Sequence, residues 1–573
     1  MIGSTELHRT GIRRWLDERL GLERLRDAIL GGEMPGGASF WHALGGAAAG
    51  LFVVEALTGV FLALFYAPSA QTAWASVAYL QDQLPFGWFV RGVHSFGSSA
   101  LIVVAGLHLL QVLVFGAYRR PRELNWIVGL ALFALTAAFA LSGYLLPWDQ
   151  KGYWAKLVES TVIGSAPVVG GAVQQVVQGG AVFGNLTITH AYSAHALLLP
   201  AAFTGLLVLH LFLHRRHGPT PRWWLTPGEL AERNQPRWPH QALRDVATAA
   251  LALAVVAVAT LAQHGAALES PADPTSSYLA RPEWYALPLF QLRTFFDGPL
   301  ELVATMVIPG AAAALLVALP FVDRGPSRRP ADRRLVMAGL AFGLGSLAVL
   351  STMAIAKDAR DPAYARARAQ EETRTREARR LALKGVPPEG GLAVFRNDPL
   401  NHARELWEQR CAGCHALDGK GGDKAPDFKG YDSRAWIRAF LTNPDGPLHM
   451  GPAKIERGMK PVTGTADELA ALTEMVYAET GATDADASRA EAGRALISAK
   501  DCDSCHEFDG DGENAGPNLK GRGTLAWVQA VIADAGQPRL FGDRNKMPKF
   551  ADKLTASEIE DLARFVLAQR TAP

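Results

Sequence analysis

Two pairs of cysteines carry the most specific chemical signal in this chain of 573 residues. The motifs that contain all four cysteines are CAGCH, with Cys411, Cys414 and His415, and CDSCH, with Cys502, Cys505 and His506. Two thiols at this spacing can bind both vinyl groups of a haem, while the adjacent histidine ligates its iron. A four-cysteine zinc site or two redox-active dithiols could use the same residues. Because the motif occurs twice, each time in a small helical segment, it favours two covalently bound c-type haems.

Methionines near the end of each segment are candidates for the second axial ligand of these irons. Met547 in NKMPKF is predicted for the second segment. In the first segment Met459 in GMKPV is preferred, and Met450 in HMGP is the alternative. The residues whose backbone carbonyls could orient the two histidine rings are Pro426 and Pro517.

Four histidines in apolar segments carry the second signal. His94 and His108 lie fourteen residues apart, and His195 and His210 lie fifteen apart in another segment. Fourteen residues make almost four helical turns, or about 21 Å, so each pair lies on one face at two depths. If the two faces are opposed, they form two bis-histidine iron sites, His94 with His195 and His108 with His210. A lone histidine in such a segment is more often a hydrogen-bonded core residue.

Smaller features beside these histidines fit a flat porphyrin. Arg91, one turn before His94, can pair with a haem propionate. The glycines that can relieve crowding between helices are Gly46, Gly59, Gly97 and Gly106.

These side chains must be positioned by seven apolar segments, each near the about 20 residues that cross a bilayer. The predicted spans are residues 38–66, 90–116, 126–147, 190–213, 245–267, 300–322 and 335–356. Arginine clusters follow the second, fourth and sixth spans, which places the N-terminus in the cytoplasm and everything after the seventh span outside. The predicted fold class is all-α, a polytopic membrane helical bundle followed by two small helical domains.

The predicted domain boundaries follow the changes in composition. They are an amphipathic cytoplasmic segment over 1–37, a four-helix domain over 38–220, a three-helix domain over 221–356, a charged helical linker over 357–395, and two repeated helical domains over 396–481 and 485–573. In the first of these, Trp15, Leu16, Leu20, Leu22, Leu25, Ile29 and Leu30 recur at helical spacing, typical of a helix on a membrane surface.

Composition excludes several classes of protein. The formal charge of +2 combines −5 in residues 391–573, from 23 Lys and Arg against 28 Asp and Glu, with +7 in the remainder. Charged residues make up 20% of a chain that is 49% hydrophobic, which excludes a disordered protein. Dense basic stretches interleaved with aromatics are missing from the sequence, so nucleic acid is not an expected partner.

The membrane segments resemble a known family. The stretches RGVHSFGSSALIVVAGLHLLQVLVFGAYRRPRELNW, GYLLPWDQKGYWA and YSAHALLLPAAFTGLLVLH resemble cytochrome b of the quinol-oxidising bc complexes. The fifteen-residue histidine spacing and PWDQ are most similar to the b6f branch. DPTSSYLARPEWYALPLFQLRTF resembles the start of that branch's subunit IV, here continuous with the b part, and both CxxCH segments resemble class I cytochrome c. The resemblance over residues 10–356 implies two non-covalent b-type haems.

The resemblance also gives a role to the PEWY residues Pro282, Glu283, Trp284 and Tyr285. A carboxylate at the outer membrane edge can accept a proton from bound quinol, so Glu283 is the predicted proton acceptor. Tyr144 and the turn Pro147–Trp148–Asp149–Gln150 are expected to form the opposite wall of the quinol pocket.

Two departures from the b6f pattern bear on cofactors and partners. Ala43 stands where that branch attaches an extra haem to a cysteine, so this covalent link is not expected. The chain also lacks the CxH…CxxH pattern of a Rieske iron–sulfur protein, which is therefore expected as a separate chain. Membrane quinol, a downstream cytochrome or oxidase, and a homodimeric complex in a bacterial inner membrane complete the expected setting.

The predicted function is that of the cytochrome b and c subunit of a proton-translocating quinol:cytochrome c oxidoreductase. Quinol is expected to be oxidised at the outer surface, with electrons passing across the membrane through two b haems and, through the Rieske chain, to the c haems. A membrane electron conduit without a Rieske partner is the alternative. A zinc-stabilised scaffold with no enzymatic activity is a third possibility.

Overall fold

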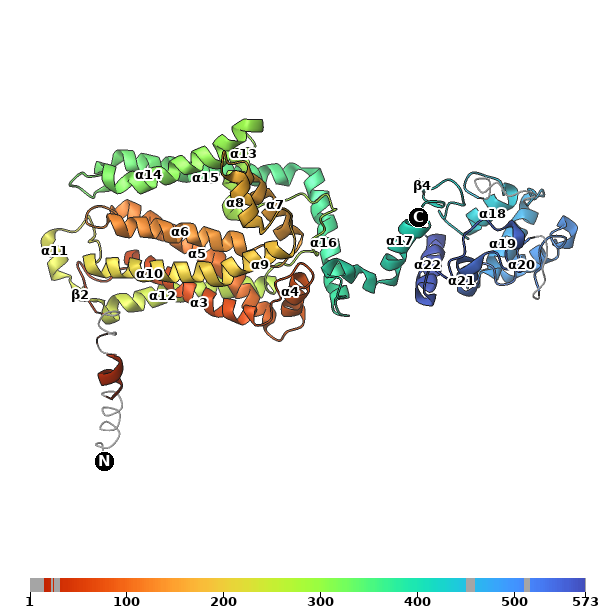
Figure 1. Cartoon of the computed structure of the whole chain (residues 1–573), viewed down its shortest axis with the longest axis horizontal. Coiled ribbons are helices and arrows are strands. Elements are labelled where there is room, and N and C mark those ends of the chain that lie inside the picture. Colours follow the sequence, from red (N-terminus) through yellow and green to blue (C-terminus); the bar gives the residue numbers. More distant parts are fainter. Residues whose placement is uncertain (1–14, 22–23, 25–30, 450–458, 510–515, 572–573) are drawn as a thin grey trace, which may run out of the picture. The chain divides into compact units, whose positions relative to one another are not determined.

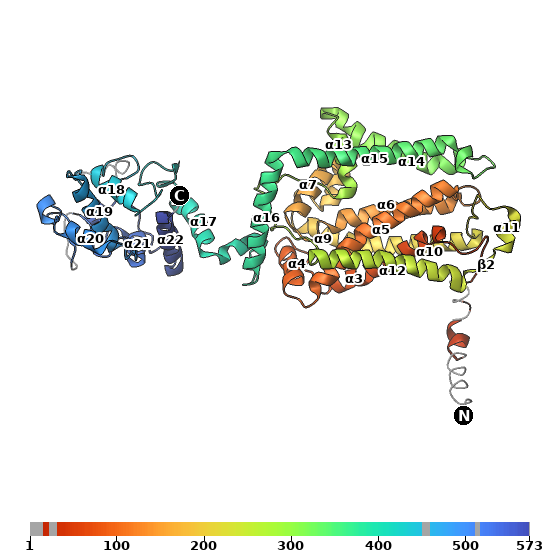
Figure 2. The same cartoon turned by 180° about the vertical axis from the view of Figure 1, so that it is seen from behind.

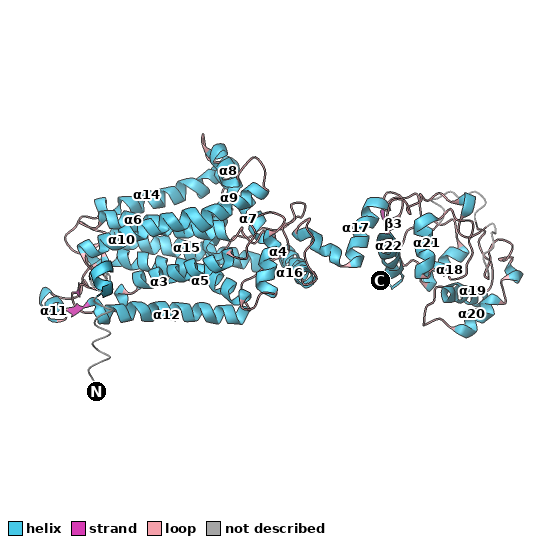
Figure 3. Ribbon diagram, turned by 60° about the horizontal axis from the view of Figure 1, so that its bottom comes forward, coloured by secondary structure: helices cyan, strands magenta, loops and turns pink. Residues whose placement is uncertain are grey.

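The computed structural model describes residues 15–21, 24, 31–449, 459–509 and 516–571, which are mostly helical (Figure 3). The chain divides into two compact units, Met1–Val394 and Phe395–Pro573. The predicted all-α class is confirmed. Residues 15–20 of the amphipathic segment are helical. Leu22, Leu25, Ile29, Leu30 and the alternative ligand Met450 lie outside the described residues.

Among the described residues, seven helices of the first unit are long and apolar enough to cross a membrane, as predicted. They are α3 (Leu44–Ala63), α5 (Gly87–Phe115), α6 (Glu123–Gly143), α9, η2 and α10 in succession (Asn185–Ser193, Ala194–Leu198, Leu199–His217), α12 (Arg237–Gln263), η4, η5 and α14 in succession (Gly298–Leu300, Val303–Val307, Ile308–Val322) and α15 (Arg334–Arg360). Helix α12 begins at Arg237, earlier than the predicted span at residue 245, and its backbone is kinked at Trp238.

Shorter elements connect and flank these helices. They are β1 (Glu33–Met34), η1 (Phe40–His42), α4 (Ala73–Asp82), α7 (Gln150–Gly164), α8 (Gly170–Gln178), α11 (Pro227–Glu232), β2 (Gln235–Pro236), η3 (Trp284–Ala286), α13 (Leu287–Arg293), η6 (Pro330–Asp332) and α16 (Pro362–Ala382). Strand β1 pairs antiparallel with β2, Glu33 opposite Pro236, and so ties the start of the described bundle to the start of α12.

The long helices run side by side in Figures 1 and 2, and two small apolar clusters hold the first four together. Between α3 and α5 the cluster contains Ala47, Leu51, Leu101 and Val104. Between α6 and α10 it contains Val128, Leu132, Phe203 and Leu213. Most other large apolar side chains of these helices are exposed, as expected for surfaces that face lipid.

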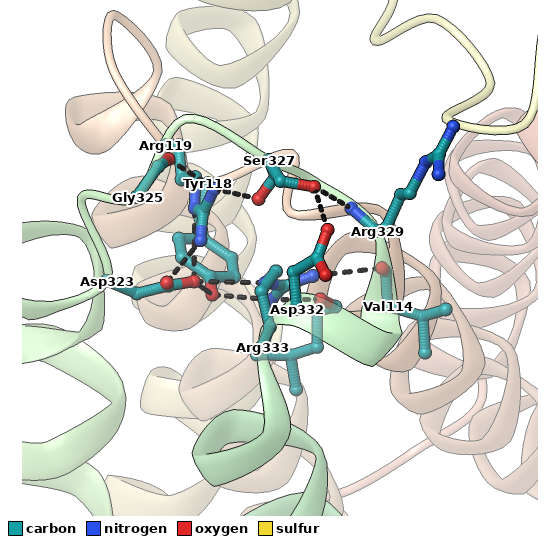
Figure 4. Close-up of polar contacts among 10 residues, drawn as sticks. Val114, Tyr118, Arg119, Asp323, Gly325, Ser327, Arg329, Asp332 and Arg333 are labelled. Atoms are coloured by element: carbon teal, nitrogen blue, oxygen red, sulfur yellow. Dashed lines mark hydrogen bonds and ion pairs between the residues drawn. The ribbon is translucent and has the colours of Figure 1, made fainter.

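A charged network fastens two loops on the basic side of the bundle (Figure 4). Asp323, after α14, accepts hydrogen bonds from Arg119, from Tyr118 and, at 3.0 Å, from Arg333 Nε. Arg333 also donates to the carbonyl of Leu113 near the end of α5, at 2.7 Å. The loop after the second span is therefore locked to the loop between the sixth and seventh spans.

The charged segment predicted as a linker is helical, and it packs against the first unit. Its helix α16 is joined to that unit by an ion pair of Arg374 with Asp273 at 2.9 Å and another of Arg379 with Asp82. Glu371 accepts a hydrogen bond from the backbone of Ser270 at 3.0 Å. The segment therefore belongs to the first unit through most of its length.

The second unit consists of short helices with polar starts. Its elements are η7 (Gly391–Asn397), α17 (Pro399–Arg410), β3 (Ala416–Leu417), β4 (Lys420–Gly421), α18 (Arg434–Thr442), α19 (Ala466–Glu479), α20 (Ala487–Arg494), η9 (Ser498–Lys500), α21 (Leu525–Asp534), η10 (Gly542–Arg544), α22 (Ala556–Ala568) and η11 (Gln569–Thr571). Thr465 and Thr555 begin α19 and α22 as N-caps, each in a capping box with a glutamate three residues later. Helix α17 packs on α22, and α20 packs on α19.

Replacing Asp323 with Asn should destabilise the bundle, because it removes the anion that two arginines share. We expect the free energy of unfolding in detergent to fall by about 3 kcal/mol, the usual effect of breaking a buried ion pair from one side. Chemical denaturation of the purified chain measures this. The matched control Asp332→Asn, at an exposed contact of the same loop, should change it by less than about 0.5 kcal/mol. Equal stability of the two variants would contradict the role of Asp323.

The same network predicts a loss of stability in acid. Burial acts to raise the pKa of Asp323, but hydrogen bonds from Arg119, Tyr118 and Arg333 outweigh it and lower that pKa. The stabilisation is therefore complete above the ordinary pKa of an aspartate, about 4, and is lost as the pH falls toward the lower folded value. Stability measured against pH should decline more steeply there in the native chain than in Asp323→Asn.

Candidate metal centres and active site

The predicted histidine pairs meet inside the bundle. His94 and His108 extend from α5, His195 from η2 and His210 from α10. The ring centroids of His94 and His195 lie 6.2 Å apart, and those of His108 and His210 lie 6.4 Å apart. Two imidazoles that each place a nitrogen about 2 Å from one ion, on opposite sides, have centroids roughly 6 Å apart. Both pairs therefore have the separation that one iron requires.

The fifteen-residue spacing of His195 and His210 is accommodated by a π-helical turn over Ala194–Leu198. This turn takes up one residue more than an α-helical turn, and Leu199 donates its N–H to the carbonyl of Ala194, five residues back. Pro200 follows and cannot donate to the carbonyl four residues before it, which favours this irregularity. The two histidines therefore face the same way, as His94 and His108 do with one residue fewer between them.

Four glycines make room for these rings. A Cβ atom would lie 3.1 Å from His108 Cε1 if added at Gly45, 3.3 Å from His94 Cε1 at Gly59, 3.2 Å from His210 Cε1 at Gly129 and 2.7 Å from His195 Cε1 at Gly143. Such a cradle is what a flat macrocycle between helices requires, so the residues present fit a haem.

Of the four predicted glycines, Gly59 alone lies against a histidine within the described contacts. Gly46 lies against Asp245, Gly97 against Glu55, and a Cβ at Gly106 would be 3.9 Å from Phe133. The missed glycines had a readable signal, because Gly45 precedes Gly59, and Gly129 precedes Gly143, by the same fourteen residues that separate His94 from His108.

Hydrogen-bond acceptors sit at the Nδ1 atoms of three of the histidines. His195 Nδ1 lies 3.0 Å from Ser142 Oγ, and His108 Nδ1 lies 3.1 Å from Gln111 Oε1. His94 Nδ1 lies 3.1 Å from the carboxylate of Glu55. An acceptor at Nδ1 holds the proton there and leaves Nε2 with a lone pair for iron. Sequence reasoning missed all three acceptors, since single polar residues in apolar helices give no periodic signal.

Arg91 has partners other than the predicted propionate. Its guanidinium is buried and donates to Gln81 Oε1 at 2.7 Å and to the carbonyls of Ala266 at 2.8 Å and Ala267 at 2.6 Å. These bonds tie α5 to the segment after α12. A contact of Arg91 with a haem carboxylate stays a prediction.

The PEWY residues lie against two elements at the end of the bundle opposite the basic loops. Glu283, after Pro282, precedes η3, and its Oε1 lies 2.6 Å from Lys151 Nζ in the first turn of α7. Both side chains are about one-third exposed, 32% for Glu283 and 36% for Lys151. Trp284 Nε1 lies 3.4 Å from Ser99 Oγ on α5, five residues after His94.

Two tyrosines share the surroundings of Glu283. Burial raises the pKa of Tyr144, and the nearby Glu159, Tyr285 and Glu283 raise it further. Burial also raises the pKa of Tyr285, reinforced by Glu283 and Glu159. Burial would lower the pKa of Lys151, but the carboxylate of Glu283 reverses the effect and raises it. The phenols therefore stay neutral and Lys151 stays charged near pH 7, next to a carboxylate.

The PWDQ turn, residues 147–150, fixes the start of α7, which carries Lys151. The backbone N–H of Gln150 donates to the carbonyl of Ser270 at 3.0 Å, and Ala272 donates back to Trp148 at 3.1 Å. Asp149 accepts from the backbone N–H of Glu269 at 3.1 Å and also caps α7. Of the expected opposite wall, Tyr144 lies near Glu283, whereas the turn is bonded to residues 269–272 and fixes the helix that presents Lys151.

The CxxCH motifs show the predicted histidine contacts. His415 Nδ1 lies 2.9 Å from the carbonyl of Pro426, and His506 Nδ1 lies 2.8 Å from that of Pro517. The rings therefore donate from Nδ1 and keep Nε2 for iron. All four cysteines are free thiols. Among the described residues, His, Cys, Asp and Glu side chains do not converge in threes as ligands of one ion.

Buried indoles add to the fit for haem in the second unit. Within the described residues, the indole nitrogens of Trp436 and Trp527 are buried without a hydrogen-bond partner. A buried donor left unpaired costs about 1–3 kcal/mol, so a partner from outside the chain is expected. The propionate groups of a haem are acceptors of the required kind.

Comparisons with known proteins agree with this geometry. The family model "Cytochrome b/b6/petB" matches residues 29–218, and "Cytochrome b(C-terminal)/b6/petD" matches residues 271–368. In the second unit, "Cytochrome c" matches residues 401–475, and "Cytochrome C oxidase, cbb3-type, subunit III" matches residues 488–566.

Relatives and a solved structure resemble the first part of the chain. Cytochrome b6 of Emiliania huxleyi is 37% identical over 204 residues, 36% of this chain and 95% of the relative. Cytochrome b6 of Mastigocladus laminosus is 35% identical over the same shares. A chain of a structure titled "Hyperthermophilic respiratory Complex III" matches with a TM-score of 0.51 and 26% identity, over 62% of this chain and 93% of its own.

If His195 and His94 hold a haem, replacing Gly143 with Leu should expel it, because the new side chain would occupy the space against His195. We expect the non-covalent b-type haem content per chain to fall by about half, since overpacking displaces one ligand pair. The covalently bound haem should stay unchanged. Pyridine haemochrome spectra measure both. The control Gly205→Leu, on α10 with open space around its Cβ, should keep the native haem content; a full b-haem content in Gly143→Leu would refute the cradle.

Proposed function

The chain belongs to the cytochrome b/b6 family, and from this premise we propose that it is the haem-binding core of a membrane quinol:cytochrome c oxidoreductase. Its cytochrome b and cytochrome c regions imply haem cofactors. Its seven apolar helices indicate a membrane protein. The likeness to a chain titled as part of a respiratory Complex III supports an oxidoreductase of that type.

We infer two b-type haems and two c-type haems. His94 with His195 and His108 with His210 would hold the b-type haems without a covalent bond, and the two CxxCH motifs would hold the c-type haems covalently. When bound, these groups supply the one-electron chemistry that side chains lack. The protein fixes their positions, their axial ligands and the proton acceptors nearby.

The observation that carries the proposal is the position of Glu283. It lies beside a lysine, with the PEWY segment against α5 close to His94, at the end of the bundle that we propose to be the outer one. We propose that the Glu283 carboxylate accepts a proton from a quinol hydroxyl, exchanging its contact with Lys151 for the substrate. Because Tyr144 and Tyr285 keep their protons, they would bind the quinol oxygens as donors. The partial exposure of Glu283 gives the accepted proton a route to water.

Oxidation of one quinol releases two electrons and two protons. We propose that one electron leaves to a Rieske iron–sulfur partner on a separate chain, and from there to the haems of the second unit. The other would cross the bundle from the His94 and His195 pair to the His108 and His210 pair, to reduce quinone near the basic loops. Covalent attachment of the second unit to the bundle raises its local concentration near that partner. A homodimer in a bacterial inner membrane, with a downstream cytochrome or oxidase, completes the proposal.

Replacing Glu283 with Gln should slow quinol oxidation while leaving every haem in place. Losing a general base lowers turnover by about a hundredfold or more. Steady-state reduction of an added cytochrome by a quinol analogue measures turnover, and difference spectra verify the haems. The control Glu232→Gln, in the exposed helix α11 on the basic side, should turn over at the native rate. Unchanged turnover in Glu283→Gln would remove this residue from the mechanism.

Purification of the complex under mild conditions tests the partner. We expect a Rieske-type chain to co-purify, and an inhibitor of the Rieske-side quinol site to stop cytochrome reduction. Turnover by a complex with no Rieske chain, insensitive to that inhibitor, would favour the electron conduit without bifurcation.

A further inference from the structure

The second unit contains two similar halves whose equivalent residues are 91 positions apart. His415 corresponds to His506, Pro426 to Pro517, and Trp436 to Trp527. In each half a helix leads into CxxCH, and a later helix follows the candidate methionine. Two independent small domains would pack these two helices of one half on each other.

In the structure, α17 packs on α22 of the second half, and α20 packs on α19 of the first half. On α17, His402 Nδ1 lies 3.6 Å from Asp561 Oδ2 of α22, and Trp407 lies with its ring centroid 6.3 Å from that of Phe565. On α20, Arg494 pairs with Glu479 of α19 at 2.7 Å. Each helix that precedes a CxxCH motif therefore packs on the last helix of the other half.

The close crossing of α20 and α19 depends on a glycine. A Cβ added at Gly493 would lie 2.7 Å from the Cβ of Met475 and would also collide with the carbonyl of Ala471. Ala403, fully buried, is a similarly small residue on α17. Both exchanged contacts are therefore intimate helix crossings, of the kind that build a core.

Each methionine lies in the same hydrophobic core as the last helix of its own half. Met547 packs against the cluster built from α17, α21 and α22, which Cys411 and Ala412 of the first motif also contact. Met459 packs against the cluster of α18 and α19, together with Ile497 and Phe508, which flank the second motif. The first motif thus shares a core with Met547, and residues on either side of the second motif share a core with Met459.

Charged residues also link the two halves of the second unit to each other. Asp432, fully buried, accepts a hydrogen bond from Arg522 at 2.6 Å. The guanidinium of Arg522 lies 5.7 Å from the ring centroid of Trp436 and 5.8 Å from that of Trp527. Glu479 accepts from the backbone of Gly521 at 3.1 Å. One arginine therefore contacts the corresponding tryptophans of both halves.

We propose that the axial methionines are exchanged between the two halves. Met547 would ligate the iron of the haem attached to Cys411, Cys414 and His415. Met459 would ligate the iron of the haem attached to Cys502, Cys505 and His506. This pairing replaces ligation within each half, and it rests on the proposed haem content of the second unit.

A cross-link tests the helix exchange independently of haem ligation. In the full chain, His402→Cys with Asp561→Cys should form a disulfide on mild oxidation. Cleavage at a protease site placed between α19 and α20 should then give two fragments that migrate together without reductant and separately with it. The control His402→Cys with Ala471→Cys joins α17 to α19, the equivalent helix of its own half, and places both cysteines on one fragment. Its cross-link is therefore read by counting free thiols with a maleimide label after oxidation, and both thiols should stay free. Cross-linking of the control pair in place of the first pair overturns the exchange.

Spectroscopy then assigns the ligands. In a chain carrying Cys502→Ser and Cys505→Ser, only the first motif can attach haem. Adding Met547→Ala should abolish the far-red sulfur-to-iron band of that ferric haem and lower its midpoint potential, because methionine ligation raises it. Adding Met459→Ala should leave both unchanged, and the reverse result overturns the proposal. A native chain without covalent haem would instead refute the proposed function, while the cross-link would still report the helix pairing.

Discussion

The membrane unit is organised by the need to bring four imidazoles together in pairs at two depths. An imidazole that lacks both water and a ligand is costly inside a bilayer, so its register on the helix is tightly constrained. The histidines of α5 meet this constraint with regular helix, and those of η2 and α10 meet it with a π-helical turn. Glycines on α3 and α6 leave room for the four imidazole rings at the same two depths. Substitution of one member therefore disturbs a set of contacts that spans four helices.

The surroundings of Glu283 are built from residues far apart in sequence. Glu283 gains its position from η3, its ionic partner from α7, and its neighbouring phenol Tyr144 from the end of α6. The PWDQ turn holds α7 against residues 269–272, and Arg91 binds the carbonyls just before them. Glu371 and Arg374 of α16 bind this same region from outside. These hydrogen bonds and ion pairs thus fix the loops that carry Glu283 and its neighbours.

Periodic features of this protein could be predicted from sequence, and features without a period could not. The seven spans and both histidine pairs follow from hydropathy and from helical geometry. Gly45, Gly129 and Gly143 could have been found from their fourteen-residue spacing, but Glu55 and Ser142 are single polar residues without such a signal. The docking of α16 depends on individual ion pairs. The exchange of α17 and α20 was beyond sequence reasoning, because two similar halves present nearly equivalent apolar faces.

The helix exchange has a consequence for the order in which the chain is made. Helix α17 finds its partner α22 only after roughly 150 further residues have been synthesised, a separation that delays folding because a long loop must close first. The first CxxCH motif therefore emerges well before the core that surrounds it can form. Until α22 arrives, the thiols of Cys411 and Cys414 stay on an open segment, accessible for the haem attachment proposed above. Maturation and translation are in this way linked, and a chain that ends before α22 would leave the core around α17 incomplete.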